Sequence, residues 1–478
     1  PQRSPLRVEW ATNCPSGSSL MSDNPNEMKR LKTGAFERRL SMAKAGFIAS
    51  TRLAAGAAGS MFANPEDREE KRRRAMAEQA QYLVCELGKL KGSVVKIGQM
   101  MALYGEHFLP PEITQALHQL NDDTTALSWS TMETVIRNQL GENRYNELDI
   151  DHSPLGTASL AQVHRARRKS DGAELVLKVQ YPGVAQAIDS DLNLVTQLLK
   201  LTKAVPMTRE FEEWLDEVRM MMHREVNYPQ EMETTRLFHS YLKDDPRYIV
   251  PRILSDYCTE TILCMSFERG VPINSPIVLG LSQERRNKLA LASLDVCVHE
   301  VFEWGEMQTD PNFGNYLVRL AEHEGGIDQI VLLDFGAVRD FSDDLITLAR
   351  GLTRGAFFKN RDLMREAMAG FGFFDNMPNS SREGLIDLMF LAIEPFSDLS
   401  DAPAETVTAD GKYIWAKSRL HIRAATHAAK SAASKNFTVP PKELMFLTRK
   451  LMGAYTFMTV IDAQVYARDL LKPYMKAP

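Results

Sequence analysis

The chain has 478 residues, of which 44% are hydrophobic and 25% charged, with a formal net charge of −5. This composition is typical of a globular protein with a large core, and the length predicts two or three domains or one large two-lobed domain. The small net charge excludes the basic field that nucleic-acid binding requires, so no nucleic-acid partner is expected. The five cysteines are odd in number and lack CxxC spacing, which favours a reducing, intracellular compartment over a disulfide framework or a zinc site.

The N-terminal part of the chain divides into two segments. Residues 1–28 are rich in Pro, Ser and Asn without periodicity, which predicts disorder. Residues 29–65 begin with a basic stretch in which apolar residues recur at helical spacing, which predicts an amphipathic helix in peripheral contact with anionic membrane lipid. The alternative is a solvated helix packed on the domain. No run of 18 apolar residues occurs, so a spanning helix is not expected.

Residues 66–150 are predicted to form a helical extension. The stretch 66–104 is first highly charged and then apolar at a spacing of three to four residues, which predicts one helix that ends before Pro110. A second, shorter helix is predicted over 129–140.

From residue 151 the period of the pattern changes, and residues 151–268 predict a small β-rich lobe. Here PLGTASLAQVHRARR leads into Asp171-Gly172 and then ELVLKVQ, which is typical of a β-hairpin. Helix follows over 184–240, and strands are predicted over 248–251 and 259–267.

Residues 269–478 are predicted to form a helical lobe with a β-rich island around 314–317 and 330–335. The chain therefore predicts an α+β fold of two lobes behind an N-terminal helical extension. A protein-kinase-like fold has this order of elements.

Two segments of the β-rich lobe carry features that phosphate binding requires. Gly156, Thr157, Ala158 and Ser159 form a stretch of small residues whose backbone N–H groups can approach phosphate oxygens, although a plain loop is the alternative. Lys178 lies in the apolar strand LVLKVQ, where a kinase carries its phosphate-binding lysine. The alternative is a lysine that faces solvent.

A buried lysine needs an anionic partner. The segment HREVNYPQEMETTRLF offers Glu225, Glu231 and Glu233, of which Glu225 and Glu231 are preferred. The sequence leaves open which of them pairs with Lys178, and solvated helix acids are the alternative for each.

The strongest chemical pattern lies in the helical lobe. Asn315 follows Asp310 at an interval of five residues, as in a kinase catalytic loop, where the aspartate contacts the nucleophile and the asparagine a metal ion. Asp334 ends an apolar strand within Asp-Phe-Gly. Oxygen ligands of this kind predict Mg²⁺ or Mn²⁺, bound together with ATP or ADP.

At this point the residues resemble a known family, the UbiB-type atypical kinases. Lys96-Ile97-Gly98-Gln99 resembles that family's KxGQ motif, and the stretch from Met265 to Phe267 resembles its interlobe hinge. LVLKVQYPGV, QTDPNFGNYLV and LLDFGAVRDF are similar to its later motifs, in the same order, within a match over roughly 80–360.

The resemblance implies an ATPase or a small-molecule or lipid kinase that supports ubiquinone (coenzyme Q) biosynthesis at a membrane. It implies contacts with prenyl-quinone precursors and with other proteins of that biosynthesis. The setting would be the cytoplasmic face of a bacterial inner membrane or the matrix side of the mitochondrial inner membrane. It also implies residue roles: Lys96 and Gln99 over the site, Lys178 on phosphate, Asn315 and Asp334 on metal, and Asp310 on a nucleophile or water.

The chain departs from the family pattern at three places: GTAS replaces an alanine-rich loop, Asn227 stands where the family has Asp, and Gln308 stands where it often has His. Two other functions compete with the first. One is a catalytically weak, nucleotide-dependent lipid-binding or scaffold protein. The other is a true protein kinase, against which the absence of His-Arg-Asp and Ala-Pro-Glu motifs argues.

Overall fold

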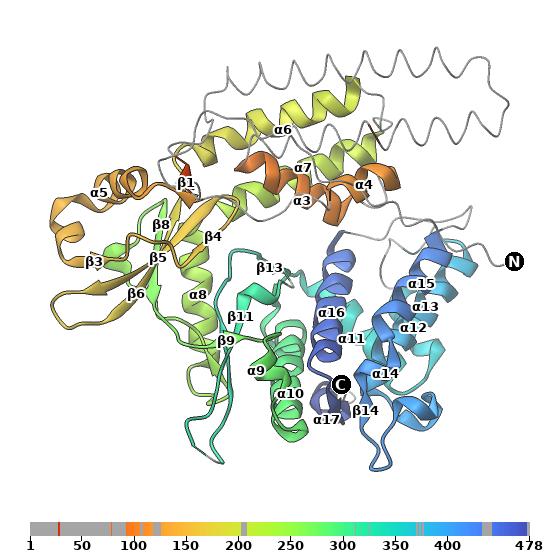
Figure 1. Ribbon diagram of the computed structural model, residues 1–478. Helices are drawn as coiled ribbons and strands as arrows, with labels where there is room; N and C mark the ends of the chain where they lie inside the picture. Colours follow the sequence, from red (N-terminus) through yellow and green to blue (C-terminus); the bar gives the residue numbers. More distant parts are fainter. Residues whose placement is uncertain are drawn as a thin grey trace, which may run out of the picture. The chain divides into compact units, whose positions relative to one another are not determined.

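The structure is a computed structural model (Figure 1). It describes residues 27–28, 78, 92–105, 109–117, 126–201, 208–310, 312–323, 325–369, 371, 374, 377–432 and 442–475. The amphipathic helix predicted within 29–65 and the disorder predicted for 1–26 lie outside these residues. Disorder was the wrong expectation for Glu27–Met28, which form strand β1 and pair in parallel with β2.

The chain forms two compact units. Residues 1–230 and 253–267 make up unit 1, and residues 231–252 and 268–478 make up unit 2. The stretch 231–252 therefore belongs with the helical unit, whereas the sequence placed it within a β-rich lobe over 151–268. The chain leaves unit 1 for the last time after Phe267.

Unit 1 is built on a five-stranded antiparallel sheet. Four strands follow the order β3-β5-β6-β8, and the fifth, β4, pairs with Gln162 and Val163 near the start of β5. The predicted hairpin is confirmed as β5 and β6, and Gly172 makes the turn between them with a φ of 72°. Leu175, Leu177 and Val179 of β6 are buried on one face of the sheet, as the alternating pattern requires. Apart from α8, the elements of unit 1 are β1 (Glu27–Met28), α3 (Ser93–Tyr104), α4 (Pro111–Leu117), β2 (Ala126–Leu127), α5 (Trp129–Asn146), β3 (Leu148–Ile150), β4 (Gly156–Thr157), β5 (Ala161–Arg168), β6 (Glu174–Gln180), α6 (Val184–Leu201), α7 (Arg209–Glu225), η1 (Ser255–Tyr257) and β8 (Ile262–Ser266).

Helix α3 carries the Lys-x-Gly-Gln sequence and packs against α4, α6 and α7 (Figure 1). It begins at Ser93, because Gly92 has a φ of 62°, which no α-helix accommodates. The prediction of one continuous helix over 66–104 was therefore wrong. The predicted helix over 129–140 is present as α5 and reaches Asn146, with a non-helical residue at Gly141.

Helix α8 (Tyr228–Leu242) supplies its first three residues to unit 1 and the rest to unit 2. The other strands and helices of the described residues belong to unit 2. They are β7 (Tyr248–Ile249), β9 (Val271–Pro272), α9 (Pro276–Leu279), α10 (Gln283–His299), η2 (Glu300–Trp304), β10 (Glu306–Gln308), η3 (Phe313–Asn315), β11 (Tyr316–Arg319), β12 (Gln329–Leu332), β13 (Val338–Asp340), α11 (Asp343–Phe357), α12 (Arg361–Ala369), α13 (Asn379–Ile393), η5 (Glu394–Phe396), η6 (Leu399–Asp401), η7 (Ala404–Thr406), β14 (Tyr413–Ile414), α14 (Trp415–Ser418), α15 (Leu420–Ala432), α16 (Lys442–Val460), β15 (Gln464–Val465), α17 (Arg468–Leu471) and η8 (Lys472–Met475).

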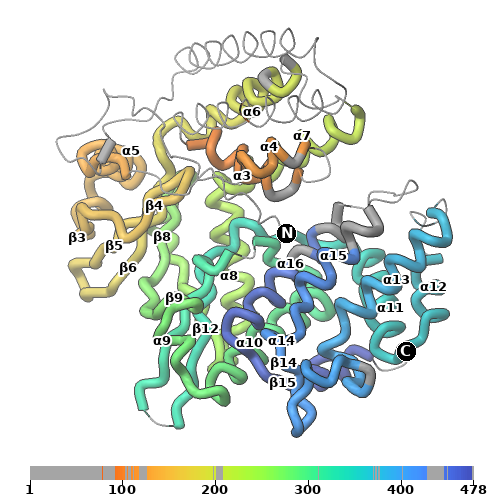
Figure 2. Tube along the Cα trace, turned by 45° about the vertical axis from the view of Figure 1, so that its right-hand side comes forward, coloured from red at the N-terminus to blue at the C-terminus, as the bar shows by residue number. Residues whose placement is uncertain are grey.

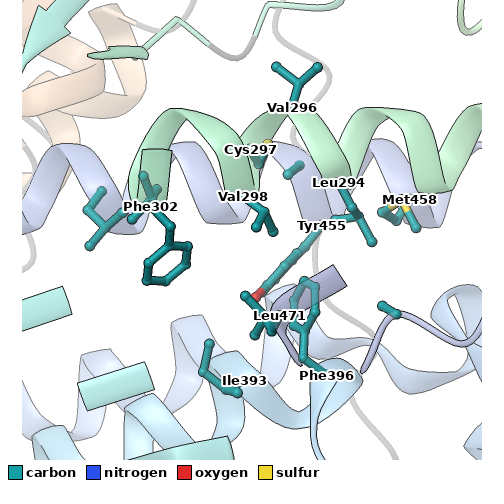
Figure 3. Close-up of a cluster of buried hydrophobic side chains, with 14 of the residues drawn as sticks. Leu294, Val296, Cys297, Val298, Phe302, Ile393, Phe396, Tyr455, Met458 and Leu471 are labelled. Atoms are coloured by element: carbon teal, nitrogen blue, oxygen red, sulfur yellow. The ribbon is translucent and has the colours of Figure 1, made fainter. Parts of the chain in front are cut away.

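The predicted β-rich island of unit 2 is confirmed as β11 and β12, which pair antiparallel inside a sheet of order β7-β12-β11-β9. Helices α11, α12, α13 and α15 gather on one side of α16, as Figure 2 shows. A large apolar core joins α10 to α16 and to the segment after α13; Figure 3 shows Val298 and Leu294 of α10 near Tyr455 and Met458 of α16, with Ile393 and Phe396 close by. This core fixes the helices that flank the β-rich island.

A buried hydrogen bond anchors the start of α3 within unit 1. Ser93 Oγ donates to Asp191 Oδ2 of α6, and both residues have no exposed surface. Removal of a donor from a buried carboxylate costs free energy, because water cannot replace it.

We expect Ser93→Ala to lower the free energy of unfolding by about 1–3 kcal/mol, because Asp191 loses a buried hydrogen-bond donor. Urea denaturation measures the change. The matched control is Ser190→Ala, whose hydroxyl bonds only to the Ala187 carbonyl at 2.9 Å within its own helix. Equal costs for the two substitutions would contradict the anchoring role of Ser93.

Candidate nucleotide and metal site

Residues of the predicted site occur in both units. Unit 1 holds the small-residue stretch, Lys178, Glu225 and the Lys96-Gln99 pair. Unit 2 holds Asp310, Asn315, Asp334 and Glu231.

In unit 1, Lys178 lies at the centre of β6, between Val163 of β5 and Leu263 of β8. It is half-buried on the face opposite Leu177, and its Nζ lies 5.3 Å from the ring centroid of Tyr228. A cation over an aromatic face at this distance is attracted to the ring. Tyr228 thus steers the lysine toward the start of α8.

The same face of β6 is tied to the junction between α7 and α8. Gln180 Nε2 donates to the Val226 carbonyl at 2.6 Å. The neighbouring Glu225 pairs with Lys96 of α3, with 2.6 Å between Oε1 and Nζ. Glu225, one of the two glutamates considered for Lys178, thus pairs with the lysine of α3.

The ion pair between Lys96 and Glu225 is partly exposed, with 23% and 31% of the two side chains accessible. Pairs of this kind contribute about 0–1 kcal/mol to stability, since solvent screens them. Gln99 lies one turn further along α3 and is also half-buried. The pair therefore orients α3 on α7 more than it stabilises the unit.

The small-residue stretch is more regular than a loop. Gly156 and Thr157 form β4, and the Ala158 N–H donates to the Ala161 carbonyl at 2.8 Å. Ser159 is buried at 4% exposure, whereas Gly156 is exposed, and a Cβ added there would meet nothing within 4 Å. Of the stretch predicted to surround phosphate, the exposed residues are thus Gly156 and Ala158.

The two predicted hinge residues end the sheet of unit 1. Met265 is buried in β8 beside Val176, and the Phe267 N–H donates to the Glu174 carbonyl at 3.0 Å. The Arg165 guanidinium lies 4.5 Å from the Phe267 ring centroid. These contacts hold the last residues of unit 1 on the edge of its sheet.

In unit 2, the pairing of β11 with β12 brings the metal-binding candidates together. Asn315 precedes β11 and Asp334 follows β12, and the Leu333 N–H donates to the Asn315 carbonyl at 3.0 Å. Asn315 Nδ2 donates to Asp310 Oδ2 at 3.0 Å. The three polar residues that the sequence predicted thus meet at one end of a strand pair.

A fourth oxygen donor joins this group. A Cβ at Gly336 would come within 3.3 Å of both Asp334 Oδ1 and Glu231 Oε2, so the two carboxylates approach the same glycine. Glu231 is 2% exposed. It was predicted as a partner of Lys178, and within unit 2 it lies near Asp334.

The donor set fits a hard divalent ion. Two carboxylates and the Asn315 amide supply oxygen ligands, and the amide oxygen is not used in its hydrogen bond to Asp310. Within the described residues no three His, Cys, Asp or Glu side chains form a metal cluster of their own. Mg²⁺ completes its coordination with water and phosphate oxygens, so a two- or three-residue set is sufficient.

Gln308, which replaces the family's histidine, connects the two acidic segments. Its Nε2 donates to the Asp334 carbonyl at 2.6 Å, and its Oε1 accepts the Asp310 N–H at 3.0 Å. Its own N–H donates to Glu300 Oε1 at 3.2 Å. Because Gln308 is 4% exposed, these bonds have no competition from water.

Sequence reasoning missed Tyr228, Glu300 and Lys450, the last of which pairs with Glu300 at 2.7 Å. Glu300 gives a faint signal, since it stands in the otherwise apolar stretch VCVHEVF shortly before Gln308. Lys450 stands in a helix far along the chain, and its spacing from the other residues carries no signal.

Two features are typical of a kinase-like protein. Unit 1 has an antiparallel sheet with a central lysine. Unit 2 has an Asp-x-x-x-x-Asn segment, followed by an Asp-Phe-Gly sequence at the end of a strand. The chain belongs to the ABC1 atypical kinase-like family, whose domain model matches residues 119–368. A solved structure, the complex of Rv3197 with erythromycin from Mycobacterium tuberculosis, matches with a TM-score of 0.55 and 22% identity. It covers 86% of this chain and 100% of that one, and it supports the kinase-like fold.

Curated relatives carry the name atypical kinase. The chain is 29% identical to mitochondrial COQ8 of Schizosaccharomyces pombe, over 82% of this chain and 62% of that protein. It is 29% identical to mitochondrial COQ8B of Rattus norvegicus, over 82% and 71%, and to mitochondrial COQ8 of Saccharomyces cerevisiae, over 80% and 74%. The sequence-based assignment to this family is confirmed. No helix in the described part of the chain is long and apolar enough to cross a membrane.

We expect Gln308→Leu to destabilise unit 2 by about 1–3 kcal/mol, because the Asp334 carbonyl and the Asp310 N–H lose a buried partner. Thermal and urea unfolding measure the loss. The control is Gln329→Leu, which removes one hydrogen bond at 2.9 Å from an exposed site. A loss at Gln308 no larger than at Gln329 would show that Gln308 does not hold the two acidic segments.

Proposed function

We propose that the chain binds ATP with Mg²⁺ and either hydrolyses it or transfers its terminal phosphoryl group to a small molecule or lipid, in support of ubiquinone biosynthesis at a membrane. The observation that carries this proposal is the meeting of Asp310, Asn315 and Asp334 at the end of β11 and β12. Acidic and amide oxygens gathered in this order are what phosphoryl transfer requires of the protein.

The proposed residue roles are those of the sequence motifs, and the local geometry of each unit supports them. Asn315 and Asp334 hold the ion, which when bound neutralises phosphate charge. Asp310 orients the attacking water or hydroxyl, and its carboxylate is held in turn by the Asn315 amide. Lys178 of unit 1 contacts a phosphate, with Tyr228 beneath its ammonium group. The exposed residue Gly156 of β4 and the segment from Met265 to Phe267 border the nucleotide.

The acceptor of the phosphoryl group is water, a small molecule or a lipid rather than a protein. The residues before Asp310 are Gln308 and Thr309, and Thr309 Oγ1 is bonded to the Ala337 carbonyl at 2.7 Å. They differ from the His-Arg pair that precedes the aspartate in protein kinases. The coenzyme Q context rests on the names of the relatives, and the membrane contact on the basic stretch of residues 29–65.

A second candidate is a nucleotide-dependent lipid-binding or scaffold protein with little turnover. The ion pair between Lys96 and Glu225 is compatible with it, because this pair holds α3, which carries the Lys-x-Gly-Gln sequence, on α7 within unit 1. Such a protein would bind nucleotide without releasing phosphate.

We expect Asp334→Asn to reduce Mg²⁺-dependent ATP hydrolysis at least roughly a hundredfold, the rate equivalent of losing several kcal/mol of metal-based charge stabilisation. Phosphate release is measured with and without liposomes that contain cardiolipin. The matched control is Asp340→Asn, an exposed aspartate on β13, which leaves the rate unchanged. Hydrolysis that survives Asp334→Asn would sink the catalytic proposal, and a nucleotide-dependent thermal shift without turnover would favour the scaffold.

We expect Lys178→Met to weaken ATP binding by about tenfold or more, because a charge-assisted hydrogen bond to phosphate is lost. Titration of a fluorescent ATP analogue without divalent ion isolates this contact from the metal. Lys200→Met, at an exposed position near the end of α6, serves as the control. Equal affinities for all three proteins would refute the phosphate contact of Lys178.

A further inference from the structure

Unit 2 contains an ion pair that the proposed function does not use. Lys450 of α16 lies 2.7 Å from Glu300 of η2, measured from Nζ to Oε2, and the two residues are 6% and 1% exposed. A buried pair of this kind contributes little more to stability than well-packed apolar residues, because both ions lose their water. Stability alone therefore does not explain why this ion pair is buried here.

Burial opposes the charge on both members of the pair and raises the pKa of the Glu300 carboxyl, which the attraction of Lys450 partly offsets. At Lys450 burial also opposes the charge, but the attraction of Glu300, with smaller contributions from Tyr316 and Cys297, raises the pKa of the amine above its usual value. The second carboxylate oxygen of Glu300 accepts the Gln308 N–H. Both oxygens of Glu300 thus face a positive or donating group.

A continuous set of polar contacts leads from this pair to the acidic residues. Glu300 holds the backbone of Gln308, and the Gln308 side chain holds the Asp334 carbonyl and the Asp310 N–H. Asp310 in turn accepts the Asn315 amide. We call Lys450, Glu300 and Gln308 the support chain.

The backbone around Glu300 is unusual. Helix α10 ends at His299, and residues 300–304 form a single turn of π-helix that closes at Gly305, with a φ of 70°. Such turns occur often at functional sites. The turn leads directly into β10, whose last residue is Gln308.

Lys450 reaches Glu300 because α16 packs along α10. Cys297 of α10 and Tyr455 of α16 belong to one apolar core, and Figure 3 shows the two helices side by side. The core fixes the helix that carries Lys450, and the support chain extends from that helix toward Asp334.

A small cavity of about 40 Å³ lies beside the ion pair. Glu300, Lys450, Asn315 and Asp334 all line it, together with aromatic residues such as Phe313 and Tyr316. At about 10–15 Å³ per water molecule, it accommodates roughly three waters and no nucleotide. Burial raises the pKa of the lining Cys297 thiol to about 11, so the cavity offers no thiolate nucleophile.

We propose that Lys450 and Glu300 are positioning residues that set the affinity of the Asn315 and Asp334 site for divalent ion, by holding Gln308 in place. This inference rests on the proposed function and names the supports of its metal site. Partners outside the ligand sphere fix the orientation of the ligands, and their loss costs about 10- to 100-fold in metal affinity or activity.

The test uses the double variant Lys450→Met with Glu300→Gln in the full chain. Both substitutions keep the side-chain volume, and the glutamine keeps an oxygen for the Gln308 N–H, so no unpaired charge is buried. Electron paramagnetic resonance follows the binding of Mn²⁺ in the presence of a non-hydrolysable ATP analogue. We expect Mn²⁺ affinity to fall about tenfold, with a smaller change in nucleotide affinity measured without divalent ion.

The control is the double variant Arg423→Met with Glu394→Gln. This bidentate pair joins α15 to η5 at 2.8 and 2.9 Å, and neither residue lines the cavity. Its loss lowers stability without a change in Mn²⁺ affinity. If the Lys450 and Glu300 double variant does not fold, Glu300→Gln alone is expected to shift Mn²⁺ affinity in the same direction.

The outcomes separate this inference from the proposed function. Mn²⁺ affinity that is the same in the wild type and in the Lys450 and Glu300 variants overturns the positioning role and leaves the metal site intact. Equal losses in the two double variants also overturn it, because they reduce the effect to general destabilisation. A wild-type chain that binds no Mn²⁺ with the ATP analogue overturns the proposed function itself.

Discussion

The antiparallel pairing of β11 with β12 is the constraint on which the rest of the site depends. Tyr316 stands opposite Leu332, so the residue before β11 and the residues after β12 meet at the same end. A shift of the register by one residue would turn every side chain to the other face of the sheet. Asn315 would then lose its place beside Leu333 and Asp334, and no metal site could form from these residues.

The surroundings of this strand end explain why acidic groups gather there. Glu231 and Asp334 approach the same glycine, and Asp310 is bonded to the Asn315 amide. Like charges at close range raise each other's energy, which a bound cation relieves. The grouping of these carboxylates supports the proposed Mg²⁺ site in unit 2.

Much of this was predictable from local pattern. The alternation in ELVLKVQ predicted β6 and the place of Lys178 on it, because a strand with one buried face permits one register only. The interval between Asp310 and Asn315, followed by Asp-Phe-Gly, predicted their convergence. The helix over 66–104 was mispredicted because apolar spacing carries no information on the positive φ at Gly92.

Contacts between distant segments of the chain could not be predicted from the sequence. Glu225 and Glu231 were equivalent candidates by spacing, and no feature of the sequence indicated that Glu225 pairs with Lys96 of α3. Lys450 and Glu300 are 150 positions apart, and only the packing of α16 against α10 brings them together. Tertiary packing decides such pairings, and a single sequence records it weakly.

The most direct test of the account is a crystal structure of the chain with Mn²⁺ and a non-hydrolysable ATP analogue, in which anomalous scattering locates the ion. The account predicts an anomalous peak bound by the side-chain oxygens of Asn315 and Asp334 and by phosphate oxygens. Nucleotide bound in the crystal with the ion on other residues, or with no ion beside Asp334, would contradict it.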